Sequence, residues 1–266
     1  MDKPLIDVAV LILFFNNPIR FQQVFHVVKK ARPGRLFLYQ DGPRKNSTDQ
    51  IGIEACRKIV DEEIDWECEV HKWYREENMG CDPSNYLSQK WAFSFVDKCI
   101  ILEDDDVPSI SFFRFCKELL DKYEYDNRIS MIAGMNHDGI TSNISSDYFF
   151  TTNISIWGWA TWKRVIDQWE GDYAFLNDPE ALRQLRDFIK SHKIRKDFFK
   201  IAQRHQASGK EFYETIISAN MLLNSGLSIV PTKNLISNIG YTGNAVHYTA
   251  PLKMMPKATQ RLFQLK

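Results

Sequence analysis

The sequence lacks several features that would place it in a specialised class of protein. Its longest apolar run, residues 8–15, is much shorter than the roughly 20 residues of a membrane-spanning helix. No secretory signal with a small-residue cleavage site is present, so we expect a cytoplasmic protein, either free or peripheral to the membrane. The 34 basic and 34 acidic residues cancel, which excludes a global field that would attract nucleic acid.

Cysteine indicates neither a disulfide framework nor a zinc site. The five cysteines are odd in number, and no two of them have the CxxC spacing of zinc or redox motifs. We therefore interpret them as reduced thiols. What the chain does have is 44% hydrophobic and 13% aromatic residues over 266 positions. This composition allows a large core and favours one α/β domain.

The first half of the sequence alternates short apolar runs with stretches of helical periodicity. The expected strands cover residues 8–15, 36–39, 68–74, 99–102, 129–133 and 227–230. The expected helical regions cover residues 19–31, 48–60, 86–96, 112–120, 179–205 and 211–223. This alternation is typical of strands joined by crossover helices, so we predict an α/β fold with a mostly parallel central sheet flanked by helices.

Four acidic residues, 103–106, follow directly on the apolar strand 99–102. Ligands of open α/β sheets bind at the carboxyl ends of the strands, so these carboxylates lie where a ligand would sit. Adjacent carboxylates repel one another unless a cation or arginines compensate, and oxygen ligands suit Mg²⁺ or Mn²⁺. A divalent ion there would bridge the phosphates of a nucleoside diphosphate. The plainer alternative is a solvated acidic loop.

A rival enzymatic interpretation uses the spacing of Asp104 and Asp106. These residues would form the DxD motif of a phosphatase of the haloacid dehalogenase type, in which the first Asp attacks phosphorus. However, Glu103 intervenes after the strand, the motif lies far from the amino terminus, and Pro108 stands where that family usually has Thr or Val. These departures make the phosphatase the weaker interpretation.

Residues 100–109, followed by Phe112 and Phe113, resemble the metal motif of GT-A glycosyltransferases, in particular the N-acetylglucosaminyltransferase I-like group. Other stretches resemble this group and related bacterial sugar transferases in the same order: residues 16–20, 40–42, 133–139, 157–164 and 226–247. The resemblance implies the GT-A fold in a single domain, 1–266, with a nucleotide-binding half (1–110) and an acceptor and sugar half (111–266).

The same resemblance implies roles for single residues. Asp105 would be the direct metal ligand, His247 would ligate the metal or contact a phosphate, and Asp106 receives no role. The residues implied to bind the nucleotide-sugar are Asn17, Arg20, Asp41, Glu103, Asp104, Asn136 and Trp159.

The resemblance also implies a catalytic base. Relatives carry a Trp-Asp dipeptide before the helix that precedes the strand after Gly226, and this chain has Tyr213-Glu214 there. Glu214 would take the proton from an acceptor hydroxyl while the diphosphate leaves from the opposite face, which inverts the anomeric configuration. We therefore expect a Mn²⁺- or Mg²⁺-dependent glycosyltransferase that moves a sugar from a UDP-linked donor to a glycan or glycolipid acceptor. Because Glu replaces Asp, a GT-A-like binding protein without turnover stays open as an alternative.

Several of these residues have plainer structural alternatives. Tryptophans such as Trp159 lie in protein cores more often than they form sugar platforms. Glu214 is equally compatible with an exposed helix residue, and His247 with an exposed histidine in a polar stretch. The basic residues of 190–204 alternate with apolar ones at helical spacing, which favours a solvated helix face over a nucleic-acid patch.

Overall fold

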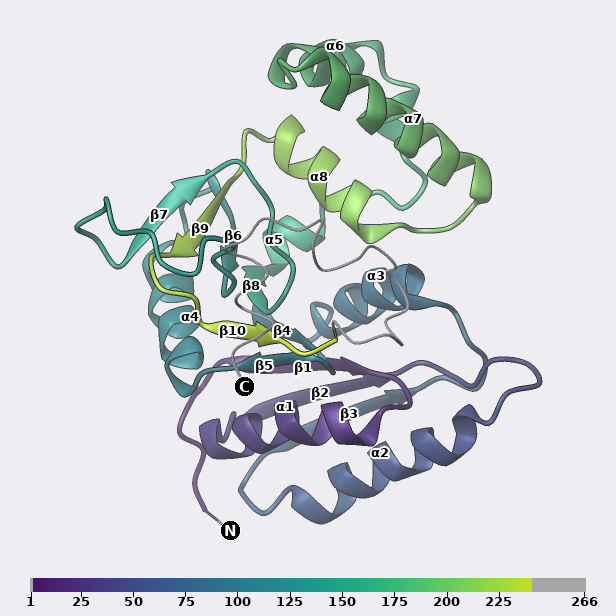
Figure 1. Cartoon of the computed structure of the whole chain (residues 1–266), viewed down its shortest axis with the longest axis vertical. Coiled ribbons are helices and arrows are strands. Elements are labelled where there is room, and N and C mark those ends of the chain that lie inside the picture. The colour runs from purple at the N-terminus through teal and green to yellow at the C-terminus, as the bar shows by residue number, and fades with distance from the viewer. Residues whose placement is uncertain (1, 241–266) are drawn as a thin grey trace.

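The computed structural model describes residues 2–240, in which eight strands form one sheet (Figure 1). The strands are β1 (Ala9–Phe14), β2 (Arg35–Gln40), β3 (Glu69–Tyr74), β4 (Lys98–Glu103), β6 (Ile129–Ala133), β7 (Tyr148–Thr151), β8 (Trp159–Trp162) and β9 (Leu227–Pro231). Their order in the sheet is β3-β2-β1-β4-β8-β6-β9-β7. Four of the seven neighbouring pairs are parallel, which confirms the predicted α/β fold with a mostly parallel sheet.

Strand β1 lies at the centre of the parallel half, between β2 and β4. Its side chains alternate between the two faces of the sheet, so Val10 and Ile12 enter one core cluster while Leu11 and Leu13 enter the other. Because helices cover both faces, every residue of the strand is buried. This double burial explains why the strand reads as a continuous apolar run in the sequence.

Helices form a layer on each face of this sheet. The α-helices are α1 (Pro18–Ala31), α2 (Asp49–Glu63), α3 (Cys81–Ala92), α4 (Ile110–Lys122), α5 (Lys163–Ile166), α6 (Pro179–Phe188), α7 (His192–Ser208) and α8 (Tyr213–Leu223), and a 3₁₀ turn, η1, covers Ala174–Leu176. Most buried apolar residues of α1, α2 and α4 belong to one core cluster, and those of α3, α6, α7 and α8 belong to the other, while α5 contributes Val165 to the first and Ile166 to the second. The sheet is therefore the middle layer of three.

Four short strands, β5 (Asp106–Pro108), β7, β8 and β10 (Ile236–Asn238), were not predicted. Strand β7 pairs antiparallel with β9 at one edge of the sheet. Strand β8 is inserted antiparallel between β4 and β6. A separate two-stranded sheet pairs β5 with β10 in antiparallel register. This second sheet brings a segment far along the chain against the acidic residues, because Asn238 stands opposite Asp106.

Helix boundaries also differ from the predictions. Helix α3 begins at Cys81 and not near residue 86, and the predicted helical region 179–205 is two helices, α6 and α7. Asp178 caps α6 and Ser191 caps α7 by accepting backbone N–H groups of the first turn. Together α6 and α7 stand at one end of the molecule's long axis (Figure 1). Among residues 2–240, no helix has both the length and the apolar character needed to cross a bilayer.

Candidate active site

The four predicted carboxylates lie in the tight connection between β4 and β5, at the carboxyl end of the sheet's parallel half. Glu103 is the last residue of β4 and pairs with Leu13 of β1. One residue later, the Asp104 Oδ2 accepts the backbone N–H of Phe15 at 3.2 Å. The acidic residues are thus anchored where β1 and β4 end side by side, which is the expected place for a ligand in an α/β sheet.

Asp106 is fully buried, and its carboxylate accepts hydrogen bonds from other parts of the protein. Its Oδ2 accepts the backbone N–H of Gly158 at 2.9 Å and that of Glu103 at 3.4 Å, while its Oδ1 accepts the Asn238 side-chain amide at 3.0 Å. These bonds connect three segments that are distant in sequence. The structure therefore gives a role to a residue that the sequence left without one.

Asp105 is partly buried, as are Glu103 and Asp104. Its Oδ1 accepts the Asn238 amide at 3.1 Å, and its backbone carbonyl accepts the N–H of Ile239 at 2.8 Å. Gly240 passes so close that a Cβ at this position would lie 1.8 Å from the Asp105 Oδ2. A larger residue at this position would therefore force the Asp105 carboxylate to move.

Glu103 connects the acidic residues to helix α8. Its Oε1 accepts the hydroxyl of Tyr213 at 3.4 Å. Tyr213 is buried at the first position of α8, and Glu214 is the next residue along the helix. The amino-terminal end of α8 is thereby held next to the end of β4. Neither Asn238 nor Tyr213 was assigned a role in this arrangement from the sequence, although Tyr213 was noted as the residue before Glu214.

Burial and mutual repulsion disfavour the charged forms of these carboxyls. Burial raises the pKa of Glu103 well above its usual value, and the charges of Asp106, Asp105 and Asp104 add to the effect. Burial, followed by the charge of Asp105, raises the pKa of Asp104 to about 7. Burial also raises the pKa of Asp105, although the positive charge of Arg20 opposes this shift. A cation bound beside these carboxyls would reverse the balance and favour their charged forms.

The donor set fits a hard divalent cation that is held partly by its substrate. Within residues 2–240, no group of three His, Cys, Asp or Glu side chains is arranged to hold a metal ion. Mg²⁺ and similar ions are commonly bound by one or two carboxylates together with substrate phosphates and water. The partly exposed carboxylate of Asp105 can supply one such ligand. His247, the other predicted ligand, lies outside the described residues.

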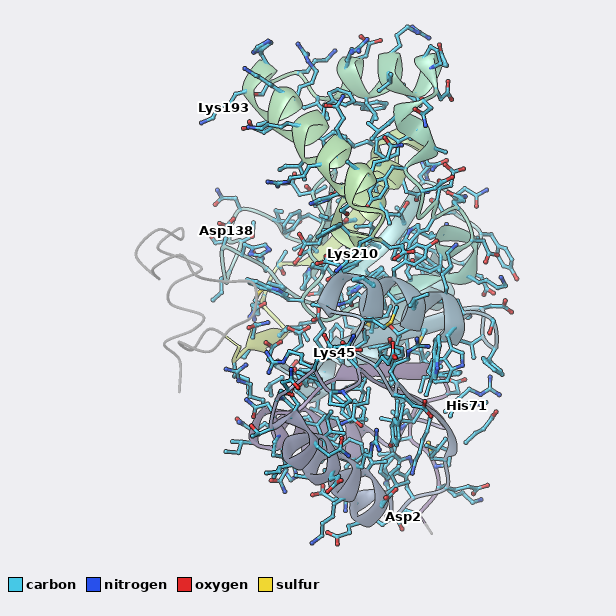
Figure 2. All side chains as sticks on the ribbon, turned by 90° about the vertical axis from the view of Figure 1, so that its right-hand side faces the viewer. Asp2, Lys45, His71, Asp138, Lys193 and Lys210 are labelled. Atoms are coloured by element: carbon cyan, nitrogen blue, oxygen red, sulfur yellow. The ribbon has the colours of Figure 1, made fainter. Side chains whose placement is uncertain are left out.

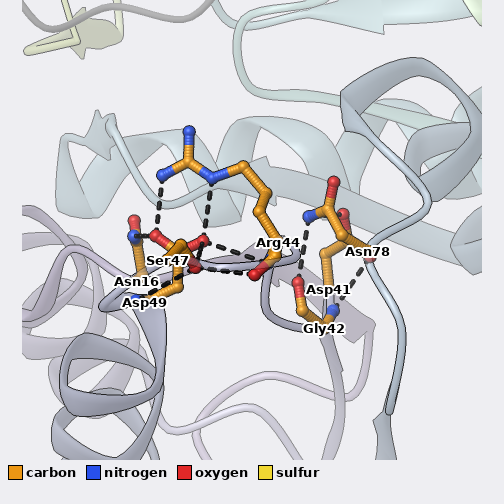
Figure 3. A network of polar contacts seen from close by, with 7 residues as sticks. All are labelled: Asn16, Asp41, Gly42, Arg44, Ser47, Asp49 and Asn78. Carbon is orange, nitrogen blue, oxygen red and sulfur yellow. Dashed lines mark hydrogen bonds and ion pairs between the residues drawn. The ribbon is translucent and has the colours of Figure 1, made fainter.

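Asp41 directly follows β2, and both oxygens of its carboxylate accept hydrogen bonds within the protein. Its two oxygens accept the N–H group of Gly42 at 2.9 Å and the Asn78 side-chain amide at 2.8 Å (Figure 3). They also accept the backbone N–H groups of Met79 at 2.8 Å and Gly80 at 3.0 Å. The side chain is 7% exposed. The carboxylate therefore fixes the loop before α3, and its predicted contact with the nucleotide is untested.

A network that the sequence did not indicate adjoins this loop (Figure 3). The buried Asp49 accepts two side-chain bonds from Arg44, at 2.7 and 2.8 Å, and one from the Asn16 amide at 2.6 Å. The hydrogen bonds from Arg44 are the main cause that holds the pKa of Asp49 well below its usual value. This network ties the loop after β1 to the start of α2.

Asn17 and Arg20 lie on the same loop and the first turn of α1. The Asn17 side chain caps the helix by accepting the backbone N–H of Arg20 at 3.1 Å. The Arg20 side chain is near enough to lower the pKa values of Asp104 and Asp105 against the larger effect of burial. Arg20 is therefore placed beside the acidic residues, whereas Asn17 has a structural use.

Two predicted binding residues are built into the protein interior, which corrects their assignment. Trp159 is 1% exposed and stacks on Trp169 at 6.4 Å between ring centroids, so it belongs to the core and offers no face to a sugar. Asn136 is 2% exposed and donates to the carbonyl of Pro231 at 2.8 Å and to the Thr141 hydroxyl at 3.0 Å. Its side chain organises the loop after β6.

Glu214, the predicted base, is exposed in the first turn of α8. The contact between Tyr213 and Glu103 places its backbone near the acidic residues. Its negative charge also contributes to the raised pKa of Tyr213, after burial and the charge of Glu103. The structure thus brings Glu103, Asp104, Asp105, Arg20 and the start of α8 into one region.

Comparison with known proteins identifies no family. No family model and no curated protein match the sequence. Solved structures with a similar chain path include a UDP-glucose pyrophosphorylase in complex with UDP-glucose, with TM-score 0.44, 7% identity and coverage of 88% of this chain and 93% of that chain. A putative glucose-1-phosphate thymidylyltransferase from Bacillus anthracis has a TM-score of 0.45 and 9% identity, with coverage of 97% of this chain and 96% of that chain. An inositol-1-phosphate CTP transferase from T. maritima has a TM-score of 0.44 and 9% identity, with coverage of 97% of this chain and 95% of that chain. At these values, nothing about the chemistry of this chain follows from the likeness.

Proposed function

We propose that this chain is a metal-dependent glycosyltransferase that moves a sugar from a nucleoside-diphosphate sugar, with UDP as the expected nucleotide, to a glycan or glycolipid acceptor. The observation that carries the proposal is the group of partly buried carboxylates at the joint carboxyl end of β1 and β4, next to Arg20 and the start of α8. Their charged forms are disfavoured without a cation. Such a site suits a ligand that arrives with both phosphates and a divalent ion.

Each residue of the site has a separate role in the proposed reaction. Asp105 would hold the cation, which would supply positive charge to stabilise the departing diphosphate. Glu103 and Asp104 accept hydrogen bonds from ribose or sugar hydroxyls, and Arg20 faces the phosphates. Glu214 removes the proton from the acceptor hydroxyl, which attacks the anomeric carbon from the side opposite the leaving group. The product therefore has the inverted configuration.

Donor binding is the first test of this function. We expect one UDP-sugar, among a panel of nucleotide-sugars, to raise the melting temperature by about 5 °C at saturating concentration in the presence of Mn²⁺ and much less without it. Slow hydrolysis of the same donor should accompany the shift. If no donor shifts the melting temperature with or without metal, the transferase proposal fails. Binding without hydrolysis or transfer would favour the inactive binding protein, and pyrophosphate release from a nucleoside triphosphate and a sugar 1-phosphate would assign nucleotidyl transfer instead.

The base is tested by Glu214→Gln. This change keeps the size of the side chain but removes its capacity to accept the acceptor proton, so we expect transfer to fall by roughly 100- to 10,000-fold while the metal-dependent donor shift stays. Glu211→Gln, in the segment just before α8, is the matched control and should leave transfer unchanged. Unchanged turnover in Glu214→Gln would exclude Glu214 as the base without affecting the assignment of the donor site.

A further inference from the structure

The lobe formed by α6 and α7 carries a concentration of positive charge in a chain whose total charge is zero. Residues 179–210 contain nine Lys and Arg residues and three Asp and Glu residues, whereas the whole chain contains 34 of each kind. The rest of the protein consequently has an excess of acidic residues. Positive charge is therefore concentrated in the lobe at the top of Figure 1.

Four of the five Lys and Arg residues of α7 occupy one exposed face, while Arg195 donates to the backbone carbonyls of Arg186 and Ile189. Lys193, Lys196, Lys200 and Arg204 are spaced by three, four and four residues, so their side chains follow one side of the helix. All four are exposed, while Ala202, on the opposite side, is fully buried. Figure 2 shows Lys193 pointing away from the body of the protein. We call this row of four residues the basic face of α7.

The basic face contains one acidic neighbour, the exposed Asp197, which lies one turn of helix from Lys193 and Lys200 but forms no ion pair with them among the described residues. None of its four side chains forms an ion pair there, whereas Arg183 of the neighbouring α6 pairs with Glu180 at 2.5 Å. Many other basic residues of the chain are paired, for example Lys29 with Asp65 at 2.8 Å. The charges of the basic face are therefore available to an external anion at close range.

Exposed apolar side chains border the same face. Ile194 is 62% exposed and Ile201 is 38% exposed, and their spacing of seven residues places them together along one edge of the row. Phe188, 43% exposed, ends α6 just before the turn into α7. Single exposed apolar residues are common, but a line of them beside unpaired cations is the pattern of a helix that lies in a membrane interface.

We propose that the basic face of α7 docks this protein onto an anionic lipid surface. The lysines and Arg204 contact head-group phosphates, and Ile194 and Ile201 enter the boundary between head groups and acyl chains. Charge complementarity selects anionic lipid, and the exposed aliphatic side chains favour a bilayer over a nucleic acid, whose phosphate backbone offers them no apolar partner. This surface lies on a different part of the fold from the carboxylates of β4 and does not depend on the proposed transferase activity.

The test is co-sedimentation of the whole chain with vesicles of phosphatidylcholine, alone or mixed with phosphatidylglycerol. We expect binding to the mixed vesicles only, and weaker binding as salt is added. Each basic residue near an anionic membrane strengthens binding by about fivefold, so the triple variant Lys193→Glu, Lys200→Glu, Arg204→Glu should bind at least about 100-fold more weakly. Ile194→Ser with Ile201→Ser should lower binding by about tenfold, including at salt concentrations that screen the charges.

The matched control reverses three charges at the other end of the molecule. Lys3, Lys30 and Lys58 are exposed, and the variant with glutamate at all three positions has the same net charge as the α7 triple variant. It should retain most of the vesicle binding. Equal binding to neutral and mixed vesicles, no binding to either, or equal losses in the two triple variants would overturn the proposal. Tighter binding to DNA or RNA than to the mixed vesicles would also overturn it and assign the surface to nucleic acid. Unchanged melting temperatures verify that every variant is folded.

Discussion

Asp105→Ala should abolish the Mn²⁺-dependent thermal shift with a nucleotide-sugar and lower turnover by roughly 1000-fold, about 4 kcal/mol of transition-state stabilisation. The reason is the position of the carboxylate. Among the acidic residues of this turn it combines partial exposure with a location between Arg20 and the β10 segment. Without it, the cation that supplies charge to the leaving diphosphate would lose its direct protein ligand.

Stability separates this result from simple unfolding. The contact between Asp105 and Ile239 uses the backbone carbonyl, which alanine retains, and Asn238 keeps its bond to Asp106. The melting temperature of Asp105→Ala without ligands should therefore stay close to that of the wild type. Asp147→Asn, an exposed acid in the loop before β7, is the control and should bind metal and donor normally. A full metal-dependent shift in Asp105→Ala would exclude Asp105 as the metal ligand.

The parallel half of the fold could be predicted because its physical cause is local. Strands such as β1 and β4 are buried on both faces, so they appear in the sequence as uninterrupted apolar runs. Helix α1 shows its apolar face at helical spacing and starts at an Asn-Pro pair that caps it. Each signal lies within a few residues of the element that it specifies.

The second half resisted prediction because its elements depend on distant partners. Strand β8 is four residues long and is defined by its pairing with two neighbouring strands. Its Trp159 pairs with Ile101 of β4 on one side and with Ala133 of β6 on the other. Strands β5 and β10 have three residues each and pair across more than a hundred positions of sequence. Such short segments carry too little periodicity to be distinguished from loops.

In the candidate site, too, features with a local cause could be predicted from the sequence, whereas features that depend on distant residues could not. Placing the acidic residues at a strand end required only the sequence around β4, and the structure agrees. The structural contacts of Asp41, Asn136 and Trp159 involve partners that lie far away in sequence. Asp41 accepts the Met79 N–H, for example, and Asn136 donates to the Pro231 carbonyl. A motif that resembles a binding loop cannot show whether its polar side chain is already satisfied within the fold.

Asp106→Ala should show the opposite behaviour to Asp105→Ala, with a loss of about 3 kcal/mol in the free energy of unfolding and a fall in melting temperature of roughly 5 to 10 °C. The buried carboxylate accepts the Gly158 N–H and the Asn238 amide, and both donors would be left without an acceptor. Gly158 cannot move away easily, because its φ is +61° and it packs directly against Ile236. Urea denaturation of the two alanine variants at neutral pH measures the difference.

This comparison also decides between the two interpretations of the acidic turn. In a DxD motif, Asp104 and Asp106 would act together, and Asp106→Ala would remove the metal-dependent shift while the free energy of unfolding stayed near that of the wild type. In the arrangement described here, Asp106 stabilises the protein by joining β4, Gly158 and β10. Its neighbour Asp105 is left to face the ligand. A stable Asp106→Ala protein that no longer responds to Mn²⁺ would therefore transfer the metal site from Asp105 to Asp106 and revive the phosphatase interpretation.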